Sequence, residues 1–173
     1  GQDAGAPQIG NPNDPGWTDE GLRMLATSAA LIDHRSGARY MFEATPDMRE
    51  QIQILDEVRA PDENPLGLSG VFITHAHIGH YTGLMYLGKE AVSANKMPVY
   101  AMPQMISYLE NNGPWSQLVT NSNIALKPLE NETPVKLSTE IEVTPFLVPH
   151  RDEYSETVGY IIKGPNKSAL FIP

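Results

Sequence analysis

The sequence predicts a layered α/β domain, and three observations lead to this fold class. Candidate strands and helices alternate up to about Ile124, and strand-like segments follow one another after it. The length of 173 residues suits a single domain spanning 1–173. Hydrophobic residues make up 40% of the chain and charged residues 19%, which is ordinary for a globular protein.

The first elements are expected to be a lead-in loop, a hairpin and a helix. Residues 1–21 are rich in Gly, Pro, Asn and Asp, which predicts a loop. The apolar runs 25–32 and 38–44 predict two strands joined by a turn at 33–37. A helix is expected over 45–58, because a proline lies near its start and its apolar residues follow helical spacing.

The middle of the chain repeats the order loop, strand and helix. After a loop at 61–70, residues 71–74 form a short apolar segment typical of a buried strand. A helix is expected over 81–91, a second buried strand over 98–101 and another helix over 103–111.

Strands dominate the last part of the chain. We expect them at 141–148, 157–163 and 168–172, with a turn at 164–167. The last strand stops at Pro173 without a following turn or cap, which predicts that the natural protein continues. The open edge of this strand is able to pair with another chain, so we expect either a longer natural protein or a homodimer formed through this edge.

Charge and composition exclude some classes of partner. The formal net charge of −9 disfavours nucleic acid, because affinity for phosphate backbones comes from Lys and Arg. No apolar run is long enough to cross a bilayer. The chain has no cysteine, so a transition metal must be bound through His, Asp or Glu. We expect a soluble protein, cytoplasmic or periplasmic, and the sequence does not decide between the two.

Three of the five histidines fall within six residues and are candidate metal ligands. His75 and His77 are two apart at a strand end, where their rings can point to the same side. His80 follows a glycine that permits a turn, and His150 lies at the end of the strand expected over 141–148. Three histidines plus water is a typical arrangement for a catalytic zinc. His34 is expected to be an exposed turn residue.

Four segments resemble the metallo-β-lactamase superfamily. Residues 71–84, VFITHAHIGHYTGL, are similar to its His-x-His-x-Asp-His signature, and residues 42–47, FEATPD, resemble its acidic turn. Residues 149–160, PHRDEYSETVGY, resemble its later single-histidine motif, and this block together with 2–8 is most similar to proteins related to pyrroloquinoline quinone biosynthesis protein B. The resemblance implies an αβ/βα sandwich of which this chain is the N-terminal portion, with the last strands and helix missing.

The sequence departs from the superfamily pattern at position 79. Gly79 stands where the family has an aspartate that serves a second metal, and glycine has no side-chain ligand. The family's bridging aspartate would come after Pro173. The resemblance therefore implies one zinc held by His75, His77 and His150, with at most a weak second site at His80. Glu43 is expected either to stabilise the fold or to orient a ligand histidine by accepting a hydrogen bond from its ring.

The resemblance implies a zinc-dependent hydrolase of a small-molecule ester, lactone, amide or phosphodiester. Asp152 or Glu153 could provide the carboxylate that acts near the metal, and Arg151 and Tyr154 could bind an anionic group of the substrate. One alternative is a biosynthetic enzyme that uses iron for oxygen chemistry on a peptide-derived or quinone-like substrate. Another is a non-catalytic binding protein stabilised by a metal.

Overall fold

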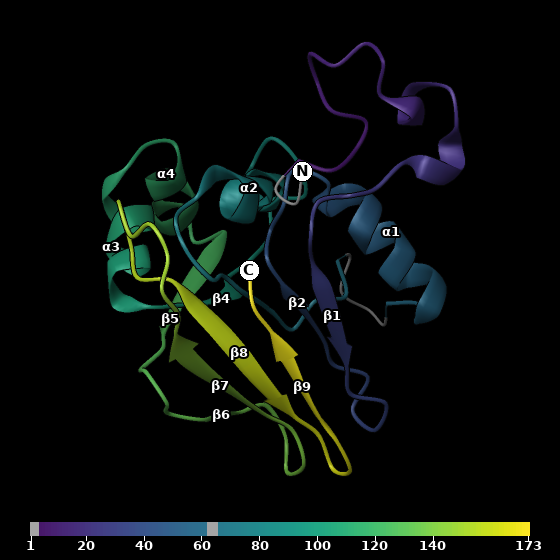
Figure 1. Ribbon diagram of the computed structural model, residues 1–173. Coiled ribbons are helices and arrows are strands. Elements are labelled where there is room, and N and C mark those ends of the chain that lie inside the picture. The colour runs from purple at the N-terminus through teal and green to yellow at the C-terminus, as the bar shows by residue number, and fades with distance from the viewer. Residues whose placement is uncertain (1–3, 62–65) are drawn as a thin grey trace.

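Two β-sheets lie against each other in the computed structural model, which describes residues 4–61 and 66–173 (Figure 1). In the first sheet β1 is antiparallel to β2, and the remaining neighbours are parallel. Its strands, in spatial order, are β1 (Ala29–Ile32), β2 (Arg39–Phe42), β3 (Gly70–Phe72), β4 (Met97–Ala101) and β5 (Ile124–Pro128). The second sheet is antiparallel and consists of β6 (Val135–Lys136), β7 (Glu142–Leu147), β8 (Val158–Lys163) and β9 (Ser168–Phe171).

Aromatic side chains fill the space between the two sheets. Phe42 of β2 and Phe72 of β3 stack with ring centroids 5.0 Å apart. Tyr160 of β8 meets the edge of the Phe72 ring at 5.5 Å from the opposite sheet. Because side chains alternate across a strand, Met41 and Val71 point to the other face of the first sheet, toward the helices. Both faces of the first sheet are therefore covered, which explains why every residue of β2 and β3 is buried.

Helices pack on the face of the first sheet that is remote from the second sheet (Figure 1). Each contributes buried apolar residues to one core cluster with Val71 and Val99, including Met48, Leu84, Met105 and Leu118. The elements on this face are α1 (Met48–Val58), α2 (Ile78–Tyr81), the 3-10 helix η3 (Thr82–Leu87), α3 (Pro103–Asn111) and α4 (Trp115–Thr120).

The helix expected over 81–91 is wrong in its bounds. The structure has the single turn α2 followed by η3, which ends at Leu87. Gly83 explains the change, because its backbone N–H donates to the carbonyl oxygen of Ala44 at 2.8 Å. A Cβ at this position would lie 2.3 Å from the carbonyl oxygen of Thr45. The chain therefore hydrogen-bonds to the end of β2 here rather than continuing a regular helix.

Smaller differences concern short elements. The first strand begins at Ala29 rather than at residue 25, and α4 was not expected because six residues are too few to show a helical period. The lead-in contains two 3-10 turns, η1 (Pro15–Trp17) and η2 (Glu20–Leu22), whose preceding aspartates accept hydrogen bonds from backbone N–H groups. Part of the expected loop 61–70 lies outside the described residues.

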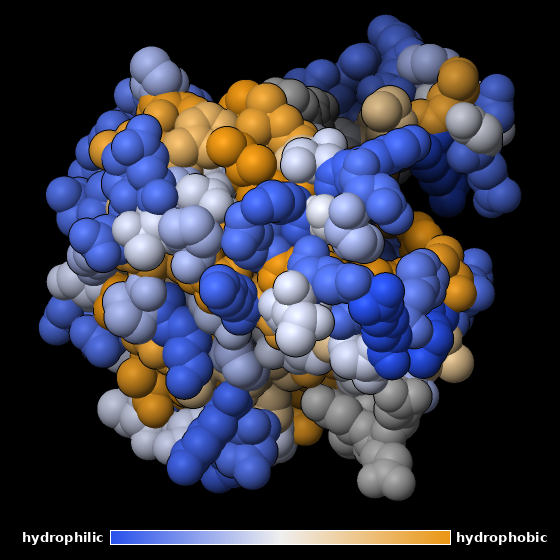
Figure 2. Space-filling model, turned by 90° about the horizontal axis from the view of Figure 1, so that it is seen from below, coloured by the Kyte–Doolittle hydropathy of each residue, from blue (hydrophilic) through white to orange (hydrophobic). Residues whose placement is uncertain are grey.

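The strand β9 lies at the edge of the second sheet. Leu170 is 62% exposed there, and the expected pairing of this edge with another chain stays a prediction. The face in Figure 2 mixes hydrophilic residues with smaller hydrophobic areas. Among residues 4–61 and 66–173, none of the helices combines the length and apolar character that crossing a membrane would need.

Candidate metal centre

Two of the candidate ligands lie in the short loop between β3 and α2. The strand ends at Phe72, and the backbone N–H of Ile73 still donates to the carbonyl oxygen of Tyr100 on β4 at 3.0 Å. His77 has extended backbone and directly precedes α2, and its carbonyl oxygen accepts from the N–H of His80 at 2.9 Å. The loop is therefore fixed at both ends, by a neighbouring strand and by a helical turn.

The third candidate ligand, His150, lies in the loop between β7 and β8. The N–H of Val148 donates to the carbonyl oxygen of Thr157 at 3.0 Å, which closes the base of this loop. The N–H of Ala76 donates to Oγ of Ser155 at 2.9 Å, in a buried contact. The two histidine-bearing loops are thus hydrogen-bonded to each other, although they are more than 70 residues apart in the chain.

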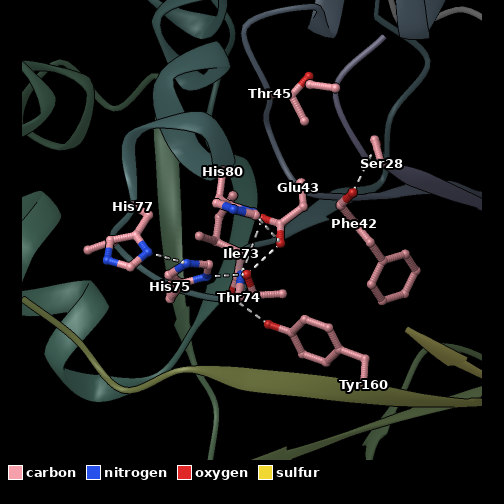
Figure 3. A network of polar contacts seen from close by, with 12 residues as sticks. Ser28, Phe42, Glu43, Thr45, Ile73, Thr74, His75, His77, His80 and Tyr160 are labelled. Carbon is pink, nitrogen blue, oxygen red and sulfur yellow. Dashed lines mark hydrogen bonds and ion pairs between the residues drawn. The ribbon is translucent and has the colours of Figure 1, made fainter. Parts of the chain in front are cut away.

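The three imidazole rings converge through one nitrogen each. Nε2 of His75 lies 2.9 Å from Nδ1 of His77, and Nε2 of His150 lies 3.1 Å from the same atom. The ring centroids of His75 and His150 are 4.9 Å apart. Figure 3 shows His75 and His77 pointing toward each other beside the end of β3. The structure therefore gathers three possible ligand nitrogens that lie within 4.8 Å of one another.

A buried chain of hydrogen bonds contacts Nδ1 of His75, on the side of the ring that faces away from His77 (Figure 3). The hydroxyl of Thr74 donates to Oε1 of Glu43 and lies 2.8 Å from Nδ1 of His75. When Glu43 is ionised, the hydroxyl of Thr74 donates its single hydrogen to the carboxylate, so the hydroxyl oxygen accepts from Nδ1–H of His75. Nε2 of His75 then carries a lone pair and faces His77. Burial raises the pKa of Glu43, and hydrogen bonds from His80 and Thr74 oppose this rise.

In His77 the roles of the two ring nitrogens are reversed compared with His75. Its Nε2 lies 2.7 Å from Oε2 of Glu153, and its Nδ1 faces the other two rings. The hydrogen bond from His77 lowers the pKa of the Glu153 carboxyl, which is therefore an acceptor at neutral pH. Nε2 of His77 must then carry the hydrogen, and Nδ1 keeps its lone pair.

With the ring hydrogens on these outer nitrogens, two lone pairs face each other at 2.9 Å, and a cation beside them would stabilise the arrangement. A proton is disfavoured, because burial and the neighbouring histidines lower the pKa of His75 to about 3. A metal ion fits the donor set, since three neutral imidazoles suit zinc, copper, iron or nickel. Ligands at about 2.0–2.1 Å from a tetrahedral zinc lie about 3.4 Å apart, a few tenths of an ångström beyond the spacings found here.

A cavity of about 640 Å³ opens beside His77. Arg151 is the one charged side chain among the described residues that line it, and its walls include the apolar side chains of Ile78 and Met85. Asp152 accepts a hydrogen bond from the hydroxyl of Thr157 at 2.7 Å. The expected catalytic role of Asp152 therefore stays a prediction.

The sequence profile described as Beta-lactamase superfamily domain matches residues 38–173. The chain belongs to this family. The expected metallo-β-lactamase fold is thereby confirmed, with its helical layer and its two sheets.

Solved structures with this metallo-β-lactamase fold resemble the chain over most of its length. Zinc-bound PqqB from Methylobacterium extorquens superimposes with a TM-score of 0.79 at 20% identity, over 98% of this chain and 61% of that one. A diphosphatase from the PhnP family gives 0.67 at 21% identity, over 94% and 59%. The short form of human tRNase Z gives 0.57 at 13% identity, over 87% and 62%. The chain thus spans about 60% of the length of these proteins.

This chain departs from the metallo-β-lactamase signature at Gly79, directly before His80. Nδ1 of His80 lies 3.2 Å from Oε1 of Glu43, and both side chains are buried. Glu43, His75 and His80 form a second group of possible ligand atoms within 4.8 Å of one another. Gly79 adds no side-chain ligand, and the weak second metal site expected at His80 stays a prediction.

Sequence reasoning did not find the roles of Thr74 and Ser155 in this metallo-β-lactamase fold. Thr74 links Glu43 to His75, and Ser155 links the two loops. The place of Thr74 directly before the first histidine is a local signal that could have indicated its contact. Nothing in the sequence indicates that Ser155 reaches Ala76, because this contact depends on the path of the β7–β8 loop. Tyr154 is 66% exposed and packs against Tyr108, with ring centroids 5.8 Å apart.

Proposed function

We propose that this protein is a zinc-dependent hydrolase whose metal is held by His75, His77 and His150. The observation that carries the proposal is the convergence of three ring nitrogens, one from each histidine, within 4.8 Å of one another. When bound, zinc in a three-histidine site makes water nucleophilic near neutral pH and polarises a carbonyl or phosphoryl oxygen.

The protein's own residues bind and orient the substrate. The cavity beside His77 offers apolar walls and one cation, Arg151, whose guanidinium group is 3.9 Å from Glu153. A substrate with an apolar body and an anionic group fits this lining. Gly79 has no side chain to act as the usual acidic partner of the reacting water, and we propose Asp152 of the β7–β8 loop for this role.

The similar structures support a hydrolytic function within this fold. They include a diphosphatase and a tRNase Z, and the PqqB structure holds zinc. The proposed substrate is an ester, lactone, amide or phosphodiester of a small molecule.

A second candidate function is iron-dependent oxygen chemistry on a peptide-derived or quinone-like substrate. The buried group of Glu43, His75 and His80 has the two-histidine, one-carboxylate composition that many iron oxygenases use. All three residues are buried, whereas such a site needs open positions for oxygen and substrate. The more exposed three-histidine group therefore supports the hydrolase better.

Metal analysis combined with activity assays tests the proposal. Purified protein, His77→Ala and His150→Ala are compared for bound zinc and iron, with His34→Ala as the matched control because His34 lies in the exposed β1–β2 turn. We expect close to one zinc per chain in the wild type and in His34→Ala, and a large loss in the two site variants. Each protein is assayed for hydrolysis and, with iron, for oxygen consumption.

Hydrolysis that depends on zinc and disappears in both site variants would support the hydrolase. Oxygen consumption with iron and no hydrolysis would favour the second function. Tight zinc binding without any turnover would instead favour a non-catalytic binding protein stabilised by the metal.

A further inference from the structure

The neighbouring ligands His75 and His77 present different nitrogens to the site. His75 presents Nε2 and His77 presents Nδ1. A neutral imidazole has one N–H and one lone pair, so each ring binds a metal through the required nitrogen only if its other nitrogen holds the hydrogen. Two adjacent histidines therefore need two separate hydrogen-bond acceptors, placed behind different atoms of their rings.

For His75 that acceptor belongs to the buried core. Thr74 and Glu43 lie at the ends of β3 and β2, and both side chains are almost fully buried. This part of the site is fixed by the parallel pairing of the two strands. The tautomer of His75 is therefore set by two residues that follow paired strands.

For His77 the acceptor comes from the β7–β8 loop. Oε2 of Glu153 lies 2.7 Å from Nε2 of His77, whereas the other two histidines face Nδ1 of the same ring. The His77 side chain is 19% exposed and that of Glu153 is 47% exposed, so packing alone does not fix the ring. A charged acceptor makes a stronger hydrogen bond than a neutral one and raises the basicity of the ligating nitrogen.

The rest of this loop is held independently of Glu153. Ser155 accepts a hydrogen bond from the N–H of Ala76, and both carboxylate oxygens of Glu156 accept from the N–H of Gln104 at the start of α3. Removing the Glu153 side chain therefore leaves the loop attached at two other points. The contact with His77 can be tested without detaching His150.

We propose that Glu153 is a positioning residue that holds His77 in the tautomer whose Nδ1 binds the metal. It acts through His77 and not as the carboxylate that exchanges protons with the substrate, because its Oε2 is occupied by Nε2 on the far side of the ring. The inference rests on the metal site proposed above. It also predicts that the charge of Glu153 matters less than its ability to accept a hydrogen bond, since a neutral acceptor fixes the same tautomer.

Zinc affinity, measured by competition with a chromophoric chelator, tests this inference. Glu153→Ala removes the acceptor, and Glu153→Gln keeps an amide oxygen that can accept from Nε2–H. Glu156→Ala is the matched control, because it removes a carboxylate of the same loop that contacts a backbone N–H instead of a histidine. Thermal unfolding of the zinc-free proteins checks that all variants fold.

We expect Glu153→Ala to weaken zinc binding about 10- to 100-fold, and Glu153→Gln to recover most of this loss, as found for residues that orient metal-bound histidines. Glu156→Ala should bind zinc like the wild type. Unchanged affinity in Glu153→Ala, or an equal loss in Glu156→Ala, would overturn the role of Glu153 and leave the metal site standing. A wild type that binds no zinc would overturn the metal site itself.

Discussion

The hydroxyl of Tyr160 donates a hydrogen bond to the carbonyl oxygen of Ile73 at 2.6 Å. Tyr160 belongs to β8 of the second sheet, and Ile73 lies at the end of β3, two residues before His75. The contact is fully buried and joins the second sheet to the segment that carries the candidate metal ligands (Figure 3). Burial raises the pKa of the Tyr160 hydroxyl well above its usual value, so this group remains a donor.

Replacement of Tyr160 by Phe tests the contribution of this contact to stability. The change leaves the carbonyl oxygen of Ile73 without this donor in a buried site, which typically costs about 1–3 kcal/mol. We expect the free energy of unfolding, measured in urea, to fall by this amount. The control is Tyr154→Phe, because Tyr154 is 66% exposed. An equal effect of both changes would count against the prediction.

Replacement of Thr74 by Val tests the link between Glu43 and His75. Valine has nearly the same shape but cannot donate to Glu43 or accept from Nδ1 of His75. We expect zinc affinity to fall about 10-fold or more, since the tautomer of a ligand is no longer fixed. Thr74→Ser should retain most of the affinity, because it keeps the hydroxyl.

Thr82→Val is the control for this substitution. The hydroxyl of Thr82 donates to the carbonyl oxygen of Ile78 at an exposed position. If Thr74→Ser lost as much zinc affinity as Thr74→Val, packing of the methyl group rather than hydrogen bonding would explain the effect.

The stability of the zinc-free protein should depend on pH through His75. Its pKa is lowered from 6.5 to about 3 in the folded state, first by burial and then by the neighbouring histidines. Between these two values the unfolded chain binds a proton that the folded chain does not, so stability rises with pH and is lost as pH falls through 6.5 toward 3. The slope from this one group is at most about 1.4 kcal/mol per pH unit.

Urea unfolding between about pH 4.5 and pH 7.5 measures this slope for the wild type and for His75→Gln. We expect a shallower profile in the variant, because the residue with the lowered pKa is gone. His34→Ala, which removes an exposed histidine of the β1–β2 turn, should leave the profile unchanged. Parallel profiles for the wild type and His75→Gln would contradict the prediction.

Replacement of Arg151 by Ala tests the proposed substrate preference. Arg151 is exposed and lines the cavity beside His77. Because exposed ion pairs contribute about 0.2–1 kcal/mol, we expect KM for an anionic substrate to rise about two- to fivefold with little change in kcat. KM for a neutral analogue should not change, and added salt should reduce the difference.

Arg35→Ala is the control for the loss of positive charge. Arg35 lies in the β1–β2 turn and pairs with Glu140 at 2.7 Å. If this variant raised KM as much as Arg151→Ala, the net charge of the protein rather than the cavity would determine the effect.

The approach of the histidines could be predicted because it depends on strand ends. His75 and His77 follow a short apolar strand, and His150 follows another, so the sequence pattern predicts that the three side chains meet. The contact of Glu153 with His77 could not be predicted in the same way. Its direction is set by hydrogen bonds of Ser155 and Glu156 to distant backbone groups, which leave no periodic pattern in the sequence.

The helix after the histidine motif shows a second limit of sequence reasoning. Apolar residues from Tyr81 onward have helical spacing, but hydrogen bonds to the end of β2 convert most of the segment into η3. Such a change depends on the close approach of two chain segments, and local propensity does not report it. The six residues of α4 were missed because a helix of this length completes fewer than two turns.

Glu43 has a φ of 79°, in the left-handed region that side chains other than glycine rarely adopt. Such a conformation costs about 1–3 kcal/mol, and here it aims a buried carboxylate at Thr74 and His80. Selection for heat resistance alone is therefore expected to favour glycine at this position. The same change would remove the carboxylate that orients His75. Selection for thermostability and selection for metal binding therefore favour different residues at this position.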